Sequence, residues 1–357
     1  MKVEPNRLSI IGAGKVGQAI AILASSAGYE AVTVGVLQPE QVPEVTRKNL
    51  SGIPIRHSVE AAREAELLLL TVPDDRIEAC CLALSKAGAL KSGMTVAHCS
   101  GALGSEVLSA AAEMGCSIGS THPLQTFPTV ETAVTTLPGT HWFTEGEPAA
   151  VERLNQLVTA IGGISVPLST SQKALYHTTA VMACNYLTSL MDMALTAAGH
   201  ADLDRDLILK ALLPLVRTTL TNIEQLGTAG ALTGPIARGD VETIARHLQA
   251  MHPHAEELQE PYRALGSWTL RLAESRGSIS SEDVQRLRQV LSRPPLQLME
   301  RVWTCVQGLG SLGWIPGPQR STEARCQSGA VRNRDTIRSH LAGQFPRREG
   351  WGESDCQ

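Results

Sequence analysis

The stretch LSIIGAGKVGQAI, residues 8–20, decides the fold of the first part of the chain. Its apolar start runs into Gly12, Gly14 and Gly17, and a helix-like run follows. In a strand–turn–helix unit of this kind, Gly12 makes the tight turn, Gly14 leaves room for a phosphate, and Gly17 lets the helix pack closely on the strand. The N–H groups and the positive dipole end of the helix then face the anion. The pattern predicts dinucleotide binding, with a purely structural glycine turn as the alternative.

The composition is typical of a globular protein, with 43% hydrophobic and 18% charged residues. A length of 357 residues allows two domains with cores of their own. The formal net charge of −4 gives no reason to expect nucleic acid or an anionic membrane surface as a partner. The eight cysteines show neither a CxxC motif nor a Cys/His ligand spacing. This usage indicates reduced thiols in a cytoplasmic protein, and no metal site is expected.

The apolar N-terminal stretch, residues 8–28, has the length of a signal peptide. Lys15 and Gln18 interrupt it, however, and the glycine pattern explains it better. The apolar run Leu67–Leu70 is far too short to span a bilayer, so we expect no membrane segment.

Strand-like and helix-like runs alternate through the first 168 residues. Strands are expected at Ala31–Leu37, Ile53–Ile55, Leu67–Val72, Thr95–His98, Gly139–Phe143 and Ile164–Pro167. Helices are expected at Val16–Ala27, Val59–Glu66, Arg76–Ala87 and Pro148–Ile161. This alternation predicts an α/β fold, a doubly wound parallel Rossmann sheet, with ligands at the carboxyl ends of its strands.

The second strand bears on the choice of cofactor. It ends at Leu37 and Gln38, where an NAD-binding unit would carry Asp or Glu for the ribose hydroxyls. The missing carboxylate removes a repulsion against a 2′-phosphate, which favours NADP over NAD. The nearest cations are Arg47 and Lys48 rather than an arginine at the turn. The expected cofactor contacts are Gly12, Ala13, Gly14, Lys15, Val16, Gly17, Gln38, Val72 and Pro73.

Three further strand ends carry polar residues. The run Leu67–Val72 stops at Pro73, and the Asp74–Asp75 pair that follows is interpreted as a turn and helix N-cap rather than a metal pair. Ser100 follows the strand Thr95–His98, and His122 precedes a proline that holds it extended. Both should project into the ligand crevice. For His122, a structural role is as open as a catalytic or substrate-binding one.

A long and nearly all-apolar helix is expected between residues 170 and 199, buried on most sides. Its polar residues Lys173, His177 and Asn185 are spaced by four and eight residues, which places them in one stripe. A buried polar stripe costs free energy unless it is satisfied or used. It is either an interhelical hydrogen-bond network or a surface that faces the nicotinamide and binds and protonates the substrate.

An all-α second domain is expected over residues 169–292. A helix at Asp204–Leu226 should kink at Pro214, and a glycine-rich loop at Gly227–Asp240 carries Arg238, which can clamp a carboxylate. Asp240 should cap the helix Val241–Met251, and further helices are expected at Ala255–Arg276 and Ser281–Leu291. His252 and His254 lack a clear third metal ligand. Residues 293–357, with nine arginines and no lysine, are interpreted as a poorly ordered tail.

Several motifs together resemble those of bacterial Rossmann-like proteins that carry a helical C-terminal domain of unknown function. The resemblance covers about residues 7–292 and rests on the glycine turn, TVPDD (71–75), HCSGAL (98–103), STHPLQTF (120–127), KALYHTTAVMACN (173–185) and ALTGPIARGD (231–240). By fold, that family groups with 6-phosphogluconate dehydrogenase, ketopantoate reductase, pyrroline-5-carboxylate reductase and prephenate dehydrogenase. The resemblance therefore implies a 6-phosphogluconate-dehydrogenase-like second domain.

The resemblance also implies roles for individual residues. Hydroxyisobutyrate- and phosphogluconate-type dehydrogenases place a catalytic lysine, and an amide or imidazole one turn later, where this chain has Lys173 and His177. Prephenate dehydrogenases have a serine after the fifth strand and a downstream His-Pro motif, similar to Ser100 and His122. At the second strand, Leu37-Gln38 departs from relatives in which a Ser-Arg pair suits NADP.

The leading hypothesis is an NAD(P)-dependent oxidoreductase acting on a small carboxylate-bearing carbonyl, alcohol or imine, with reduction of a 2-oxo acid, as in ketopantoate reductase, as the specific form. Lys173 or His177 would supply the proton, Ser100 and Asn185 would orient the oxygen, and Arg238 would hold the carboxylate. An imine reductase of the pyrroline-carboxylate type is a further possibility. The alternative from another class is a non-catalytic dinucleotide-binding or redox-sensing protein. A homodimer is expected in either case.

Overall fold

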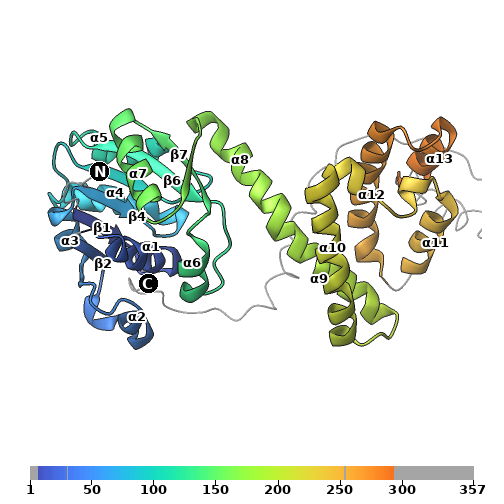
Figure 1. Ribbon diagram of the computed structural model, residues 1–357, viewed down its shortest axis with the longest axis horizontal. Helices are drawn as coiled ribbons and strands as arrows, with labels where there is room; N and C mark the ends of the chain where they lie inside the picture. Colours follow the sequence, from blue (N-terminus) through green and yellow to red (C-terminus); the bar gives the residue numbers. More distant parts are fainter. Residues whose placement is uncertain (1–6, 30, 253–254, 293–357) are drawn as a thin grey trace, which may run out of the picture. The chain divides into compact units, whose positions relative to one another are not determined.

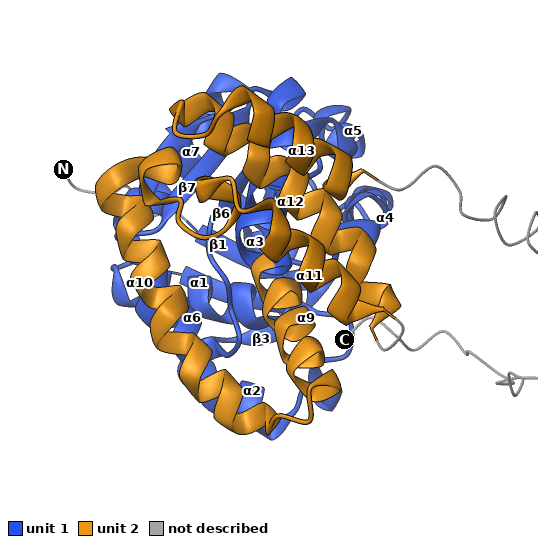
Figure 2. Cartoon of the chain, turned by 90° about the vertical axis from the view of Figure 1, so that its right-hand side faces the viewer, with its two compact units in different colours: residues 1–186, 348–357 blue, residues 187–347 orange. Residues whose placement is uncertain are grey.

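The computed structural model describes residues 7–29, 31–252 and 255–292. They divide into two compact units, one up to Tyr186 and the other from Leu187 onward. Figure 2 colours these units separately. The tail expected beyond residue 292 lies outside the described residues, as does His254.

The first unit is built on an eight-stranded sheet in the order β3-β2-β1-β4-β5-β6-β7-β8. Figure 1 labels β1, β2, β4, β6 and β7 of this sheet. Its strands are β1 Arg7–Ile11, β2 Ala31–Val36, β3 Ile55–His57, β4 Leu67–Leu70, β5 Thr95–His98, β6 Ser117–Pro123, β7 His141–Gly146 and β8 Ile164–Pro167. From β1 the chain adds β2 and β3 toward one edge of the sheet, and it then returns to place β4 on the other side of β1. The strand order therefore reverses between the neighbouring strands β1 and β4. The carboxyl ends of these two strands form the topological switch point at which such sheets bind ligands.

The last two strands, β7 and β8, run parallel to each other and opposite to the other six. β7 pairs antiparallel with β6, with Glu145 opposite Ser120 and Phe143 opposite His122. The predicted α/β fold with a doubly wound, mostly parallel sheet is confirmed, and the parallel arrangement fails only at the pairing of β6 with β7. The connection between the two strands holds only the short helix α6, Val130–Thr136. Because it begins and ends at the same edge of the sheet, it needs no crossover helix.

Helices cover both faces of the sheet. One face packs on α1 (Lys15–Ser26), α6 and α7 (Pro148–Ala160), and the other on α3 (Ser58–Glu64), α4 (Asp74–Lys86) and α5 (Ser109–Ala112). Short helices η1 (Pro39–Gln41), α2 (Glu44–Asn49) and η2 (Ser105–Leu108) lie in the connections. Successive residues of a strand point to opposite faces: Ile10 packs in the core with α1, α6 and α7, and Ile11 packs in the core with α3, α4 and α5. A strand buried on both faces produces the continuous apolar runs seen in the sequence.

The long helix that follows the sheet is less regular and less buried than expected. After η3 (Thr170–Gln172) it comprises α8 (Lys173–Ala180), a π-helical turn η4 (Val181–Asn185) and α9 (Tyr186–His200). Lys173 is the buried residue of α8, whereas Leu175 and Met182 are 74% and 61% exposed. The expectation of burial on most sides is wrong for the single chain, because it assumed that the chain's own elements would cover every apolar face.

The second unit continues with α10 (Arg205–Ala231), η5 (Ile236–Arg238), α11 (Val241–Met251), α12 (Glu256–Arg276) and α13 (Ser281–Leu291). Asp240 caps α11 as predicted, its carboxylate accepting the Thr243 N–H at 3.0 Å. In α10 the residue with non-helical dihedrals is Gly227, at φ 70°, rather than a residue beside Pro214. Glycine adopts this conformation at little cost. No described helix is long and apolar enough to cross a membrane.

Candidate active site

The glycine turn after β1 has the geometry that its sequence predicts. Gly12 has a φ of +113°, and a Cβ atom there would lie 3.0 Å from the Thr71 main chain. A Cβ on Gly17 would overlap the Gly12 carbonyl and the Thr71 hydroxyl, which donates to that carbonyl at 3.0 Å. Gly14 faces open space. The turn is therefore closed around Gly12 and Gly17 and open at Gly14, where an anion would approach.

The start of α1 favours a bound anion. Gly14 occupies the N-cap without a side-chain cap, and the first turn carries no acidic residue. The turn is fixed from behind by Gln18, a buried residue whose amide donates to the Ala13 carbonyl at 2.6 Å and accepts from Asn49 at 3.0 Å. The sequence analysis considers Gln18 only as a polar residue that interrupts an apolar run. The feature that could have indicated its role is its position directly after Gly17.

The loop after β2 leaves Gln38 exposed, with no acid at the strand end. The side chain of Arg47 is held against this loop by hydrogen bonds. Its guanidinium donates to the carbonyls of Val42, at 3.2 Å, and Pro39. Arg47 therefore shapes the loop that follows Gln38 and places a positive charge there.

Ser100 shapes the loop after β5. Its hydroxyl donates to Asp74 at 2.7 Å and accepts the N–H groups of Ala102 and Leu103 at 3.2 and 3.0 Å. Asp74 is the first residue of α4, and Pro73 rather than Asp74 holds the N-cap position. The expected N-cap role of this aspartate is therefore corrected: it anchors Ser100 from the first helical turn. No group of three or more potential metal-ligating side chains occurs in the described part of the chain.

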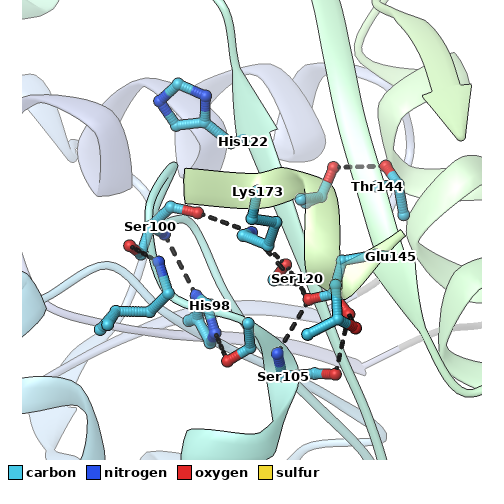
Figure 3. A network of polar contacts seen from close by, with 12 residues as sticks. His98, Ser100, Ser105, Ser120, His122, Thr144, Glu145 and Lys173 are labelled. Carbon is cyan, nitrogen blue, oxygen red and sulfur yellow. Dashed lines mark hydrogen bonds and ion pairs between the residues drawn. The ribbon is translucent and has the colours of Figure 1, made fainter. Parts of the chain in front are cut away.

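Glu145 and Lys173 form the centre of a buried polar network (Figure 3). The Glu145 carboxylate accepts from the Ser105 N–H (2.8 Å) and from the hydroxyls of Ser105 (3.0 Å), Ser120 (2.6 Å) and Thr170 (2.8 Å). Lys173 Nζ donates to Ser120 Oγ at 2.5 Å and lies 4.0 Å from Glu145 Oε1. These contacts join the loop after β5, strands β6 and β7, and the start of α8.

Burial and pairing act in opposite directions on the two charges. Burial alone would raise the pKa of Glu145, but hydrogen bonds from Ser120, Thr170 and Ser105 and the Lys173 ammonium hold it below its usual value. Burial lowers the pKa of Lys173, and Glu145 opposes that shift. The carboxylate is therefore ionised at neutral pH and needs its cation.

Two imidazoles meet over the loop after β5. The rings of His122 and His177 pack edge to face with centroids 5.5 Å apart. A Cβ on Gly101 would overlap His177 Nδ1 and lie 2.9 Å from His122 Nε2. His122 Nδ1 lies 2.9 Å from the Tyr176 hydroxyl. His177 Nδ1 is buried and makes no hydrogen bond among the described residues.

The protonation of His122 follows from its surroundings. Burial lowers the pKa of His122 to about 4, with the neighbouring His177 and Lys173 acting in the same direction. Burial also raises the pKa of Tyr176, so its hydroxyl stays protonated and is able either to donate to Nδ1 or to accept from it. Where the hydroxyl donates, the proton of the neutral ring sits on Nε2, the atom that faces Gly101.

The structure brings together four of the six expected catalytic and substrate-binding residues: Ser100, His122, Lys173 and His177. Asn185 is exposed at the end of the π-helical turn, which breaks the regular spacing that would have placed it in one stripe with Lys173. Arg238 is exposed in the second unit. The sequence did not single out Glu145, Ser120 or Tyr176.

Two family models match the sequence. A Rossmann-like domain covers residues 1–123, and the domain of unknown function DUF2520 covers residues 140–269. The chain joins a Rossmann-like domain to a DUF2520 domain. The resemblance drawn from the motifs is thereby confirmed, and the DUF2520 match includes Glu145, Lys173 and His177.

Solved structures share this fold at low sequence identity. A Bacteroides fragilis protein assigned as an NADP oxidoreductase is 19% identical, with 76% of this chain and 98% of that chain covered and a TM-score of 0.57. A Streptomyces aurantiacus imine reductase is 17% identical, with 80% and 100% covered and a TM-score of 0.54. A Thermotoga maritima protein is 20% identical, with 82% and 99% covered and a TM-score of 0.51. No curated protein matches the sequence.

Proposed function

We propose that this Rossmann-like/DUF2520 protein is an NAD(P)-dependent reductase of a small molecule with a C=O or C=N bond. The observation that carries the proposal is the glycine turn at the switch point of the sheet, open at Gly14 and followed by the uncapped start of α1. This arrangement suits a dinucleotide pyrophosphate. The fold shared with the Bacteroides NADP oxidoreductase and the Streptomyces imine reductase supports the same class of activity.

The chain's residues fit a dinucleotide of the NADP type. The turn Gly12–Gly17 would hold the pyrophosphate through N–H groups, and Val72 and Pro73 follow β4 at the same switch point. Gln38 would lie near the ribose, where no carboxylate repels a 2′-phosphate and Arg47 supplies a positive charge. When bound, the nicotinamide supplies the hydride.

The neighbouring imidazoles of His122 and His177, which we call the imidazole corner, support the proton chemistry. We place the ring proton of His122 on Nε2, where it can bond to a carbonyl oxygen or imine nitrogen and polarise it. Tyr176 would stabilise this tautomer by donating to Nδ1, and His177, also at the corner, is the second candidate donor. Ser100 contributes by shaping the loop, because its hydroxyl is committed to Asp74 and two backbone N–H groups. Asn185 and Arg238 remain candidates for binding the substrate's polar groups.

The substrate class that we propose is a 2-oxo acid or a cyclic imine. Fluorescence titration with NADPH and NADH tests cofactor binding first. Oxidation of NADPH is then followed at its nicotinamide absorbance with ketopantoate and with 2-methyl-1-pyrroline. Binding with turnover of either compound supports the proposal. Tight NADPH binding without turnover across a broad panel of both classes would favour the redox-sensing alternative, and absence of binding would overturn both.

We further propose that a second copy of the chain covers the exposed apolar faces of the long helices. In the first unit, Leu175, Met182 and Tyr186 are 74%, 61% and 58% exposed. Apolar patches of this kind mark interaction surfaces. Sedimentation equilibrium should give a dimer, and Leu175→Glu/Met182→Glu should give a monomer. A wild-type monomer would contradict this proposal.

A further inference from the structure

We infer that the buried Lys173–Glu145 pair positions the imidazoles of His122 and His177, and that Lys173 itself does not donate the proton. The inference rests on the proposed function, because it concerns how the candidate proton donors of that function are held. It also assigns a part to Glu145, which the sequence did not single out.

Lys173 is badly placed to act on a substrate. Its side chain is 1% exposed. Its ammonium already donates to the Ser100 carbonyl at 2.9 Å and to Ser120 Oγ at 2.5 Å. A general acid has to come within about 2.6–3.2 Å of the atom that it protonates. Lys173 is held inside the network, whereas the two imidazoles are only partly buried.

Lys173 holds the imidazole corner from both sides. Through the Ser100 carbonyl it fixes the loop whose next residue, Gly101, lies against both imidazoles. On its own helix, Tyr176 and His177 follow within about one turn, and Tyr176 reaches His122 at 2.9 Å. A change at the ammonium would therefore move the loop and the helix together.

The buried carboxylate of Glu145 requires a cation next to it. It collects donors from three segments besides α8: Ser105 after β5, Ser120 on β6 and Thr170 before α8. Loss of the lysine alone leaves a buried carboxylate without a counter-charge, which is strongly destabilising. Loss of both charges leaves a neutral network, because an amide at position 145 can still accept the Ser105 N–H and donate to hydroxyl oxygens.

This difference provides the test. Lys173→Met, Glu145→Gln and the double variant are made in the full chain, with Leu157→Ala as a control that removes a buried apolar side chain of α7 outside the polar network. Three measurements are compared: the thermal midpoint, NADPH binding by fluorescence, and the ¹³Cε1–¹H NMR signals of His122 and His177, assigned through His122→Asn and His177→Asn. Turnover is measured with ketopantoate and 2-methyl-1-pyrroline.

Lys173→Met should displace both histidine signals and lower turnover by about a hundredfold or more, as misplaced catalytic groups do. The double variant should return both signals close to wild type and restore turnover to within about tenfold, because the two substitutions compensate within one contact. Leu157→Ala should lower the thermal midpoint and leave both signals in place. If Lys173→Met does not fold, the turnover of the double variant carries the test.

Two results would overturn the inference. One is a double variant with wild-type histidine signals but no turnover, which would make Lys173 the proton donor. The other is a folded Lys173→Met variant whose histidine signals stay at their wild-type positions. A wild-type protein that does not bind NADPH would instead overturn the proposed function, and the NMR comparison would still decide whether the pair positions the imidazoles.

Discussion

The hydroxyl of Tyr176 lies 2.9 Å from Nδ1 of His122. In the proposed tautomer this hydroxyl donates to Nδ1 and leaves the ring proton on Nε2. Tyr176→Phe removes this donor while keeping the ring stacked on Phe143. We expect turnover to fall roughly tenfold, equivalent to about 1.4 kcal/mol, with NADPH binding unchanged. Steady-state kinetics and fluorescence titration check this. An unaltered rate would show that the tautomer of His122 does not matter for the reaction.

Gly101 is the position where a side chain would do most damage to the imidazole corner. Gly101→Ala would press a methyl group onto His177 Nδ1 and His122 Nε2. We expect a loss of about 1–3 kcal/mol in the free energy of unfolding, as in other overpacked sites. Combining it with His177→Ala should recover part of that loss, because the overlap is removed. Urea unfolding of both variants gives the comparison; equal losses would contradict the packing argument.

Gly14 and Gly17 should respond oppositely to the same substitution. Gly17→Ala meets the Gly12 carbonyl and should destabilise the fold by about 1–3 kcal/mol. Gly14→Ala meets nothing, so the protein should fold normally but bind NADPH more weakly. Thermal unfolding and fluorescence titration separate the two effects. Full NADPH affinity in Gly14→Ala would argue against a phosphate at this position.

The cofactor preference depends on the end of β2. Gln38→Glu restores the carboxylate expected of NAD-binding units and would repel a 2′-phosphate. NADPH affinity should fall by about tenfold relative to NADH, a difference of about 1.4 kcal/mol. Parallel titrations with both cofactors measure the ratio, and an unchanged ratio would move the 2′-phosphate site away from Gln38.

The stability of the fold should decrease in mild acid. Burial lowers the pKa of His98 to about 4, and its ring accepts the Ser100 N–H and contacts the Gly104 carbonyl. The unfolded state takes up this proton near pH 6.5, so stability is complete above that pH and is lost as the pH falls from 6.5 toward 4. The loss from His98 amounts to up to about 3 kcal/mol.

Urea unfolding between pH 8 and 5 measures this loss. His122, whose pKa is lowered in the same direction, adds to it. His98→Gln is the control: it should be less stable at pH 8 and should show a flatter dependence on pH. A wild-type stability that rises on acidification would contradict the neutral, buried state of His98.

Much of the fold could be predicted from local patterns. Four elements have the bounds that the sequence predicts: Thr95–His98, Ile164–Pro167, Val241–Met251 and Ser281–Leu291. The direction of β7 could not be predicted, because an alternating pattern looks the same in parallel and antiparallel pairing. Strand direction depends on whether the preceding connection crosses the sheet, and here it does not.

The site was predictable only in part. Lys173 was identified because a charged residue stood out in an apolar helix, and it is buried as that contrast predicts. Glu145 could not be found in the same way. In the strand HWFTEG it looks like an ordinary exposed residue near a strand end, and the partners that reveal it, Ser105 and Lys173, lie 40 and 28 positions away. Only the assembled sheet brings them together.

The hydrogen bonds of Glu145 with several segments also limit where this chain can be truncated or recombined. A chain cut directly after β8 would keep the acid and lose Lys173, leaving a bare carboxylate inside the sheet domain. An exchange of nucleotide-binding halves between homologues would meet the same difficulty if the crossover point fell between Glu145 and Lys173. The smallest piece that carries its own charge balance runs from β1 through α8, so α8 must be inherited and engineered together with the sheet.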